Sequence, residues 1–91
     1  MDKGFEKLDA ILDSDKIIVR QNLGEPKNGG EEIDIYRIEG NALVIFYQWK
    51  NEQEKAKALI LYGSSGEVLY AKNIRLISRE TYQFLSNIIG D

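Results

Sequence analysis

Four polar residues near the middle of the chain, Glu32, Asp34, Gln48 and Lys50, are of the types that can act on phosphate esters. The carboxylates and the amide oxygen are groups that can hold a divalent cation, and the lysine could steady a phosphate beside it. We predict that these residues belong to two neighbouring strands. No other cluster in the sequence has residue types and an order so similar to those of a catalytic site.

The order of Asp34 and the triplet Gln48-Trp49-Lys50 resembles the metal-binding pattern of magnesium nucleases of the restriction-endonuclease type. That resemblance implies a small magnesium-dependent hydrolase centred on Asp34 and Lys50. However, a tight turn at Gly40-Asn41 would put Asp34 and Gln48 on opposite faces of the hairpin. Glutamine is also a weak metal ligand, and 91 residues leave no room for the crossover helix of that fold. We therefore interpret the cluster as a solvated strand end, and we predict no catalytic, cofactor-binding or metal-binding residue.

The composition excludes several other chemistries. The chain has no histidine and no cysteine, so disulfides, zinc fingers, thiol nucleophiles and imidazole bases are ruled out. Twelve Lys and Arg side chains against fifteen Asp and Glu give a net charge of −3, the wrong sign for general binding to a nucleic-acid backbone. The sequence starts with no signal-peptide pattern, and its longest apolar run, residues 42–47, is too short to span a membrane. We expect a cytoplasmic protein with no cofactor and no membrane contact.

The hydrophobic pattern predicts a single α+β domain over residues 1–91, an antiparallel meander of about five strands with a helix at each end. A first helix is expected over residues 3–13, because Phe5, Leu8, Ile11 and Leu12 share one face. The last helix is expected to follow Ser78 as its N-cap and to bury a stripe made by Tyr82, Leu85, Ile88 and Ile89. The predicted strands cover residues 16–22, 32–39, 42–49, 57–62 and 67–72, and residues 23–30 and 51–55 are predicted to be loops.

Both faces of the predicted sheet are apolar. With Gly40-Asn41 as a two-residue turn, Ile35 would lie opposite Phe46 and Arg37 opposite Val44. Either the helices divide between the faces, or the sheet curls, or a second molecule covers one face. We favour the second molecule, because an open face of this kind would exceed the apolar patch that monomers tolerate.

These features predict a non-enzymatic protein-interaction module that forms a homodimer, or binds another protein, through one apolar sheet face. Tyrosine and tryptophan dominate interface energetics, so aromatic residues on that face are the expected anchors. The predicted interface residues are Tyr36, Ile45, Tyr47, Trp49 and Tyr70.

Two further surfaces remain as alternatives. A single-stranded nucleic acid could be bound by the segment Lys50–Lys57 together with Arg75 and Arg79, with aromatic residues as stacking platforms. An acidic edge made by Glu31, Glu32 and Asp34 could meet a basic partner, although charges also protect exposed strand edges from aggregation. Small acidic chains without cysteine occur among phage and mobile-element proteins, but this similarity is one of composition and no motif carries it.

Overall fold

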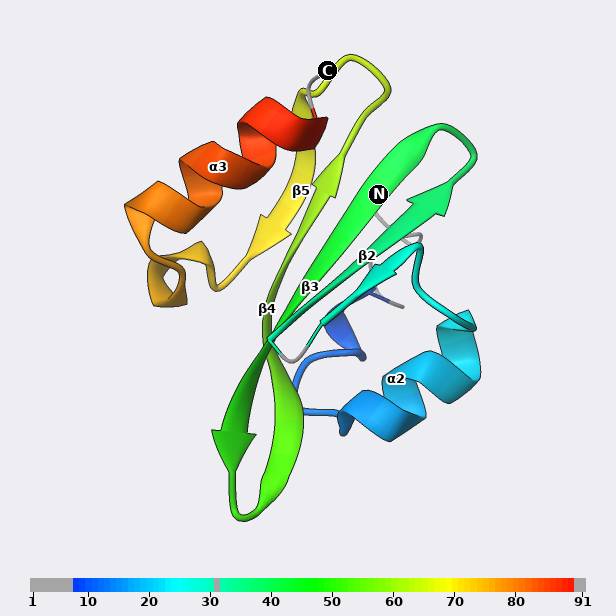
Figure 1. Ribbon diagram of the computed structural model, residues 1–91, viewed down its shortest axis with the longest axis vertical. Coiled ribbons are helices and arrows are strands. Elements are labelled where there is room, and N and C mark those ends of the chain that lie inside the picture. Colours follow the sequence, from blue (N-terminus) through cyan, green and yellow to red (C-terminus); the bar gives the residue numbers. More distant parts are fainter. Residues whose placement is uncertain (1–7, 31, 90–91) are drawn as a thin grey trace.

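A twisted antiparallel sheet separates two helices in the computed structural model, which describes residues 8–30 and 32–89 (Figure 1). Strands β2 to β5 follow one another as a four-stranded meander, and the two-residue β1 adds a short pairing beside β2. The α+β class and the antiparallel meander are thus confirmed. The elements are α2 (Lys16–Leu23), β1 (Asn28–Gly29), β2 (Ile33–Ile38), β3 (Asn41–Lys50), β4 (Gln53–Tyr62), β5 (Val68–Lys72), the 3-10 helix η1 (Ile74–Leu76) and α3 (Arg79–Ile89).

The strand predicted at residues 16–22 was wrong, because this segment forms α2. Its run of β-branched residues favours a strand locally, but as a helix it directs Val19 and Leu23, which are four residues apart, toward the sheet. Gly24, with a φ of 88°, ends the helix, and its N–H group donates to the Arg20 carbonyl at 2.8 Å. Tertiary burial therefore overrides the local preference. Because residues 16–22 are helical, the meander has four strands, β2 to β5, and the expected number of about five strands was slightly off.

The segment before α2 packs on the same face of the sheet. Residues 8 and 9 are helical but residues 10–13 form turns, so the last four residues of the helix predicted over 3–13 are not helical. Leu8, Ile11 and Leu12 pack against the core beneath α2, as their spacing predicted. Phe5 and the start of that predicted helix lie outside the described residues.

The C-terminal helix begins where the sequence predicted. The Thr81 N–H donates to the Ser78 side-chain oxygen at 3.1 Å, which confirms Ser78 as the N-cap. Leu85 is buried, and Tyr82 packs against the same core. The predicted roles of Ile88 and Ile89, and of Gly90 as a cap, lie outside what is described of this end of the chain.

The first hairpin turns one residue earlier than predicted. Glu39 and Gly40, with φ of 51° and 86°, form the two-residue turn, because tight hairpins need both central residues in the left-handed region. Ile35 therefore lies opposite Val44, and Ile33 lies opposite Phe46. This register differs from the predicted one by two residues, so every side chain keeps its predicted face.

The loop predicted at residues 51–55 is mostly strand. Only Asn51 and Glu52, with φ of 53° and 64°, make the turn between β3 and β4. The ladders to β2 and β5 end at Phe46 and Leu59. Next to them, Tyr47 still donates to the Glu32 carbonyl, and Ala56 accepts from the Asp13 N–H and donates to the Ser14 carbonyl, so only the outer part of the β3–β4 hairpin is a two-stranded projection. We call residues 47–57 the hairpin arm; it extends past both helices in Figure 1.

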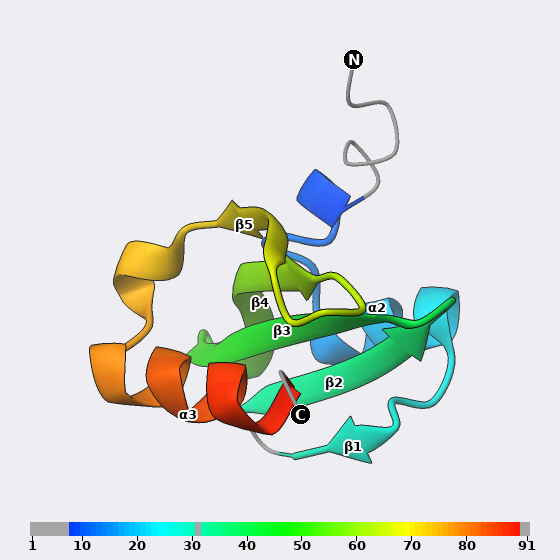
Figure 2. The same cartoon turned by 90° about the horizontal axis from the view of Figure 1, so that it is seen from above.

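The helices divide between the two faces of the sheet, which was one of the three expected solutions. Figure 1 shows α2 and α3 on opposite sides. Figure 2 shows residues 8–13 beside β5, where the Tyr70 hydroxyl donates to the Asp9 carboxylate. None of the described helices is long and apolar enough to cross a membrane. The core under α2 contains Val19, Tyr36, Leu43, Ile45, Tyr47, Ala56 and Leu59, and the core under α3 contains Ala42, Val44, Phe46, Ala58, Ile60, Tyr62 and Leu85.

Candidate protein-interaction surface

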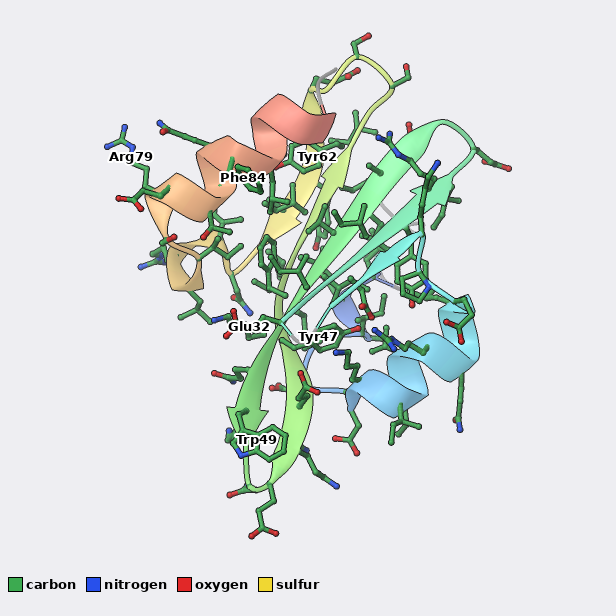
Figure 3. The ribbon with its side chains drawn as sticks, in the orientation of Figure 1. Glu32, Tyr47, Trp49, Tyr62, Arg79 and Phe84 are labelled. Atoms are coloured by element: carbon green, nitrogen blue, oxygen red, sulfur yellow. The ribbon has the colours of Figure 1, made fainter. Side chains whose placement is uncertain are left out.

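Two large apolar side chains stand exposed on either side of one hollow, between the hairpin arm and the start of α2. Trp49 on the arm is 70% exposed and Ile17 on α2 is 71% exposed. The hollow has a volume of about 240 Å³, and Glu52, Gln53 and Glu54 complete its arm side. Figure 3 shows Trp49 near the tip of the arm, away from the body of the molecule. Burying these two side chains would remove a large apolar area from water, which favours association.

The helical geometry of α2 explains why Ile17 is exposed. Successive helical residues point about 100° apart, so burying Val19 against the sheet leaves its predecessors facing elsewhere. Ile18 is 46% exposed and borders a separate groove on the other side of the helix. We call Ile17 and Trp49 the α2 apolar surface. Because both side chains are mostly exposed, they bury little apolar area in the fold and add little to its stability.

Charges around the hollow are balanced within the chain. The Lys16 ammonium lies 3.5 Å from the Glu54 carboxylate, and the Lys55 ammonium lies 3.6 Å from Asp15. Lys16 also lies over the Tyr47 ring, 5.2 Å from its centre, and donates to the Gly30 carbonyl. Most of the charged side chains that border the Ile17–Trp49 hollow are therefore already paired with a side chain of opposite charge.

Three of the five predicted interface residues lie inside the molecule. Tyr36, Ile45 and Tyr47 are buried under α2, so they are core residues and the prediction that they anchor a partner was wrong. These three residues do share one face of the sheet, but the segment expected to be a strand is the helix that covers it. Tyr70 is half-buried beside the segment before α2, and Trp49 alone of the five is largely exposed.

The acidic edge was also predicted incorrectly at its central residue. Asp34 is fully buried, and the Arg20 guanidinium donates to both of its oxygens, at 2.7 and 3.0 Å. The Tyr47 hydroxyl donates to the same carboxylate at 2.9 Å. Glu32 is exposed as expected, and Glu31 lies outside the described residues. The Asp34 carboxylate thus links α2 to the sheet and does not face water.

This network fixes the protonation state of its members. Burial alone would raise the pKa of the Asp34 carboxyl, but the hydrogen bonds from Arg20 and Tyr47 outweigh that effect and hold the pKa below its usual value. Burial and the neighbouring carboxylate raise the pKa of the Tyr47 phenol well above its usual range. Burial also raises the pKa of Tyr36, whose hydroxyl donates to the Gly24 carbonyl at 3.0 Å. Both phenols are therefore neutral at physiological pH and are unsuited to act as bases.

The residues of the predicted nuclease-like cluster are not brought together. Asp34 lies opposite Ile45, and Lys50 lies five positions further along β3, about 17 Å along an extended strand. Tyr47 shares the face of Asp34, so Gln48 points to the other side. Among the described residues there is no group of three or more carboxylates that could hold a metal ion.

The features proposed for nucleic-acid binding are also dispersed. Tyr36, Tyr47 and Tyr62 are buried, so their rings do not form a stacking platform on the surface. Glu52 and Glu54 lie between Lys50 and Lys55 in the arm, which reduces the positive field along it. Arg75 and Arg79 are exposed at η1 and at the start of α3.

The chain matches no protein-family model, no curated protein and no solved structure. The function of the α2 apolar surface must therefore be inferred from its own residues. Sequence reasoning missed Ile17 and Ile18 because α2 was expected to be a strand. The signal available was the four-residue spacing of Val19 and Leu23 followed by Gly24, which is typical of a helix and its end.

Proposed function

We propose that the protein is a non-enzymatic interaction module that forms a homodimer through the hollow bordered by Ile17 and Trp49. The observation that carries this proposal is the exposure of both side chains on one concave surface. Tryptophan is the residue type most enriched among interface residues that contribute strongly to binding. Because α2 and α3 already cover the two sheet faces, we assign the proposed interface to the arm and not to the open sheet face expected from the sequence.

A second copy fits this hollow electrostatically. In a two-fold interface the same patch lies on both sides, so a patch with a net charge faces a patch of the same net charge. Here the Lys16–Glu54 and Lys55–Asp15 pairs cancel, which leaves the carboxylate of Glu52 as the remaining charge among the lining residues. A strongly charged partner would gain little from such a rim, whereas a second copy can approach it with little repulsion.

The arm supplies the geometry for a reciprocal contact. Trp49 projects from the arm, and Ile17 belongs to the body of the molecule, on the opposite side of the same hollow. A two-fold rotation would let Trp49 of each copy pack against Ile17 of the other. Each of the two copies would then bury its own Trp49 and its own Ile17 in the same interface.

Intrinsic fluorescence tests the proposal directly, because Trp49 is the only tryptophan in the chain. Dilution of the wild-type protein should move the emission to longer wavelengths as Trp49 becomes exposed to water. The variant Ile17→Lys should show the exposed emission at every concentration. Ile38→Lys is the matched control, since Ile38 is an exposed isoleucine near the Glu39-Gly40 turn, distant from the arm. Wild-type emission that does not change with concentration would contradict the proposal.

A further inference from the structure

Strand β3 loses its neighbour on one side within the hairpin arm. β2 begins at Ile33, where the Gly30 N–H donates to the Ile33 carbonyl at 2.9 Å and closes a tight turn toward β1. β3 continues to Lys50, so the described chain places β4 on one side of its last residues and no strand on the other. A sheet edge of this kind presents backbone groups that can pair with another chain.

The hydrogen bond of Tyr47 shows where these backbone groups point. Its N–H donates to the Glu32 carbonyl at 2.7 Å, on the side of β3 where β2 lies. Backbone groups alternate in direction along a strand, and the pairing with β4 is regular from Tyr47 to Lys50. The N–H and carbonyl of Trp49 therefore point the same way. Within residues 8–30 and 32–89, neither group of Trp49 has a hydrogen-bond partner, and nor does the Tyr47 carbonyl.

A hollow of about 490 Å³ lies along this edge, within the range of ligand-binding sites, which is roughly 300–1,000 Å³. Its lining residues are Glu32, Tyr47, Gln48, Trp49, Glu54 and Lys57. Figure 3 shows Glu32 and Tyr47 at the base of the arm and Trp49 nearer its tip. Gln48 and Trp49 point to opposite faces of the strand, so the hollow reaches around the edge of β3.

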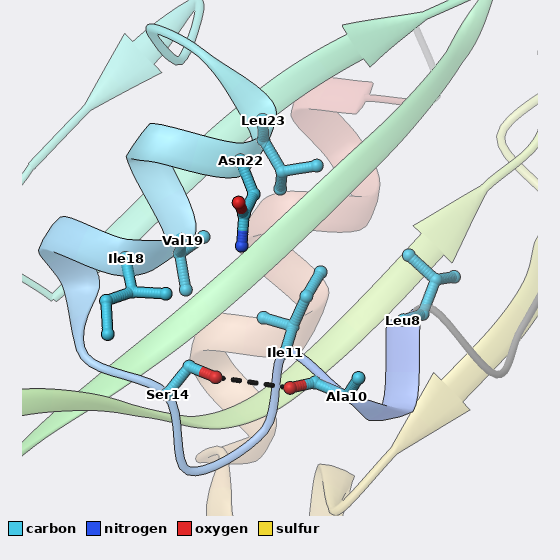
Figure 4. A pocket seen from close by; sticks show the side chains of 8 residues that line it. All are labelled: Leu8, Ala10, Ile11, Ser14, Ile18, Val19, Asn22 and Leu23. Atoms are coloured by element: carbon cyan, nitrogen blue, oxygen red, sulfur yellow. Dashed lines mark hydrogen bonds between the residues drawn. The ribbon is translucent and has the colours of Figure 1, made fainter.

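The apolar groove on the other side of α2 differs from this edge. Figure 4 shows it between α2 and residues 8–14, and most of its lining side chains are aliphatic. The Ser14 hydroxyl at its border donates to the Ala10 carbonyl at 3.1 Å. Aliphatic side chains accept an apolar group in any conformation, whereas the unpaired backbone groups of the arm select an extended chain.

We propose that an extended segment of a partner protein adds to β3 at this edge, as an extra strand in line with β2. Backbone pairing with the Trp49 N–H and carbonyl would supply affinity, as in other cases of strand addition. A β-branched residue beside the Trp49 ring would make a favourable cross-strand contact. Of the charged lining residues, Glu54 is paired with Lys16, and the other two have opposite signs. Recognition therefore depends on the backbone and not on charge.

A second copy of the chain fits this edge poorly. Two arms paired about a two-fold axis at Trp49 would place Asn51 of each copy opposite Tyr47 of the other. That position is already occupied by Glu32. Pairing nearer the tip would involve the turn residues, which are not extended. The inference does not rest on the proposed homodimer, because Ile17 does not line this hollow and strand addition uses the backbone of Trp49.

A pair of substitutions isolates the Trp49 N–H. Trp49→Val and Trp49→Pro both remove the ring, but only proline also removes the N–H. This N–H points away from β4, so proline leaves the ladder between β3 and β4 intact. The probe is a fluorescein-labelled peptide of five alternating valines and threonines, and its binding is followed by fluorescence polarisation. It should bind Trp49→Pro at least about tenfold more weakly than Trp49→Val.

A second probe makes the test independent of any change that proline causes in the arm. Methylation of every backbone nitrogen of the same peptide removes its donors and should weaken binding to the wild-type protein at least about tenfold. Ile17→Lys, which should prevent the proposed self-association, should bind the unmethylated peptide at least as tightly as the wild type does. Circular dichroism confirms that each variant is folded.

Three results would overturn the proposal. If the peptide binds neither the wild type nor Ile17→Lys, the edge does not accept a strand. Equal binding of the methylated peptide, or equal binding to Trp49→Pro and Trp49→Val, would mean that side chains or another edge, such as β5, hold the peptide. Self-association that Trp49→Val retains and Trp49→Pro loses would assign the edge to a second copy.

Discussion

The guanidinium of Arg20 on α2 and the carboxylate of Asp34 on β2 form a two-pronged ion pair, with N–O distances of 2.7 and 3.0 Å. Asp34 is fully buried, whereas about a third of the Arg20 side chain remains exposed. The pair joins the helix to the sheet face that it covers. It therefore sets where Ile17 and Ile18, on the same helix, stand relative to the hairpin arm.

Loss of Arg20 should be strongly destabilising. Arg20→Ala leaves the Asp34 carboxylate buried without its cation, and breaking a buried pair in this way typically costs about 3–5 kcal/mol. We expect the lower end of that range, because Tyr47 still donates to Asp34 and Arg20 is partly exposed. Urea unfolding of the variant measures the loss. Replacing the whole network, as Arg20→Met with Asp34→Leu and Tyr47→Phe, should recover much of the stability, because no buried polar group is then left without a partner; a triple variant as unstable as Arg20→Ala would show that the ion pair is not the cause.

Stability should depend on pH through Asp34. Its pKa in the folded protein is lower than the ordinary value of about 3.9, so the unfolded state binds more protons as the pH falls. The contribution of Asp34 is thus complete above about pH 4 and is lost as the pH falls through the folded pKa. The difference in unfolding free energy between the wild type and Asp34→Asn should be constant near neutral pH and should shrink below about pH 4. A difference that grows as the pH falls would have the wrong sign for this network.

Removing the Tyr47 hydroxyl should cost more than removing that of Tyr36. Tyr47→Phe loses a hydrogen bond to a buried carboxylate, worth about 1.5–3 kcal/mol, whereas Tyr36→Phe loses one to the Gly24 carbonyl, worth about 1 kcal/mol. Both rings are buried and are kept by the substitution, so the pair of variants isolates the two hydroxyls. Thermal unfolding monitored by circular dichroism compares them. Equal losses would indicate that the charge on Asp34 adds nothing to its bond with Tyr47.

The first hairpin turn offers a stabilising substitution. Glu39 has a φ of 51°, which a glutamate adopts at some cost, and Gly40 follows it with a φ of 86°. Glu39→Asn creates Asn-Gly, the pair most favoured in such turns, and should add up to about 1 kcal/mol. An increase in the unfolding temperature with an unchanged circular dichroism spectrum is expected. A decrease would mean that the glutamate makes a contribution other than its backbone conformation.

Much of the fold followed from local pattern. The hairpins, the two apolar faces and the Ser78 cap all depend on residues close in sequence, and for these the alternation of side chains and the turn residues are informative. The register of the first hairpin was missed because Gly40 can occupy either position of a two-residue turn. The left-handed conformation of Glu39 decides between the two registers, and its residue type gives little indication of it.

The site was harder to predict because it depends on α2. Three consecutive β-branched residues indicated a strand, and only packing against the sheet shows that Val19 faces inward while Ile17 and Ile18 do not. The position of Asp34 among the apolar residues of its face was a usable signal, since a buried carboxylate requires a cation. The cation is Arg20, but it can be assigned to Asp34 only when the segment that contains it is known to be a helix.

The molar mass in solution, measured by light scattering over a wide range of concentration, tests the proposed self-association most directly. The wild-type protein should approach twice the mass of one chain as concentration rises, and Trp49→Ala should need at least about tenfold higher concentration to do so while remaining folded. A wild-type protein that keeps the mass of one chain throughout would contradict the proposed homodimer, as would a Trp49→Ala variant that associates as strongly as the wild type.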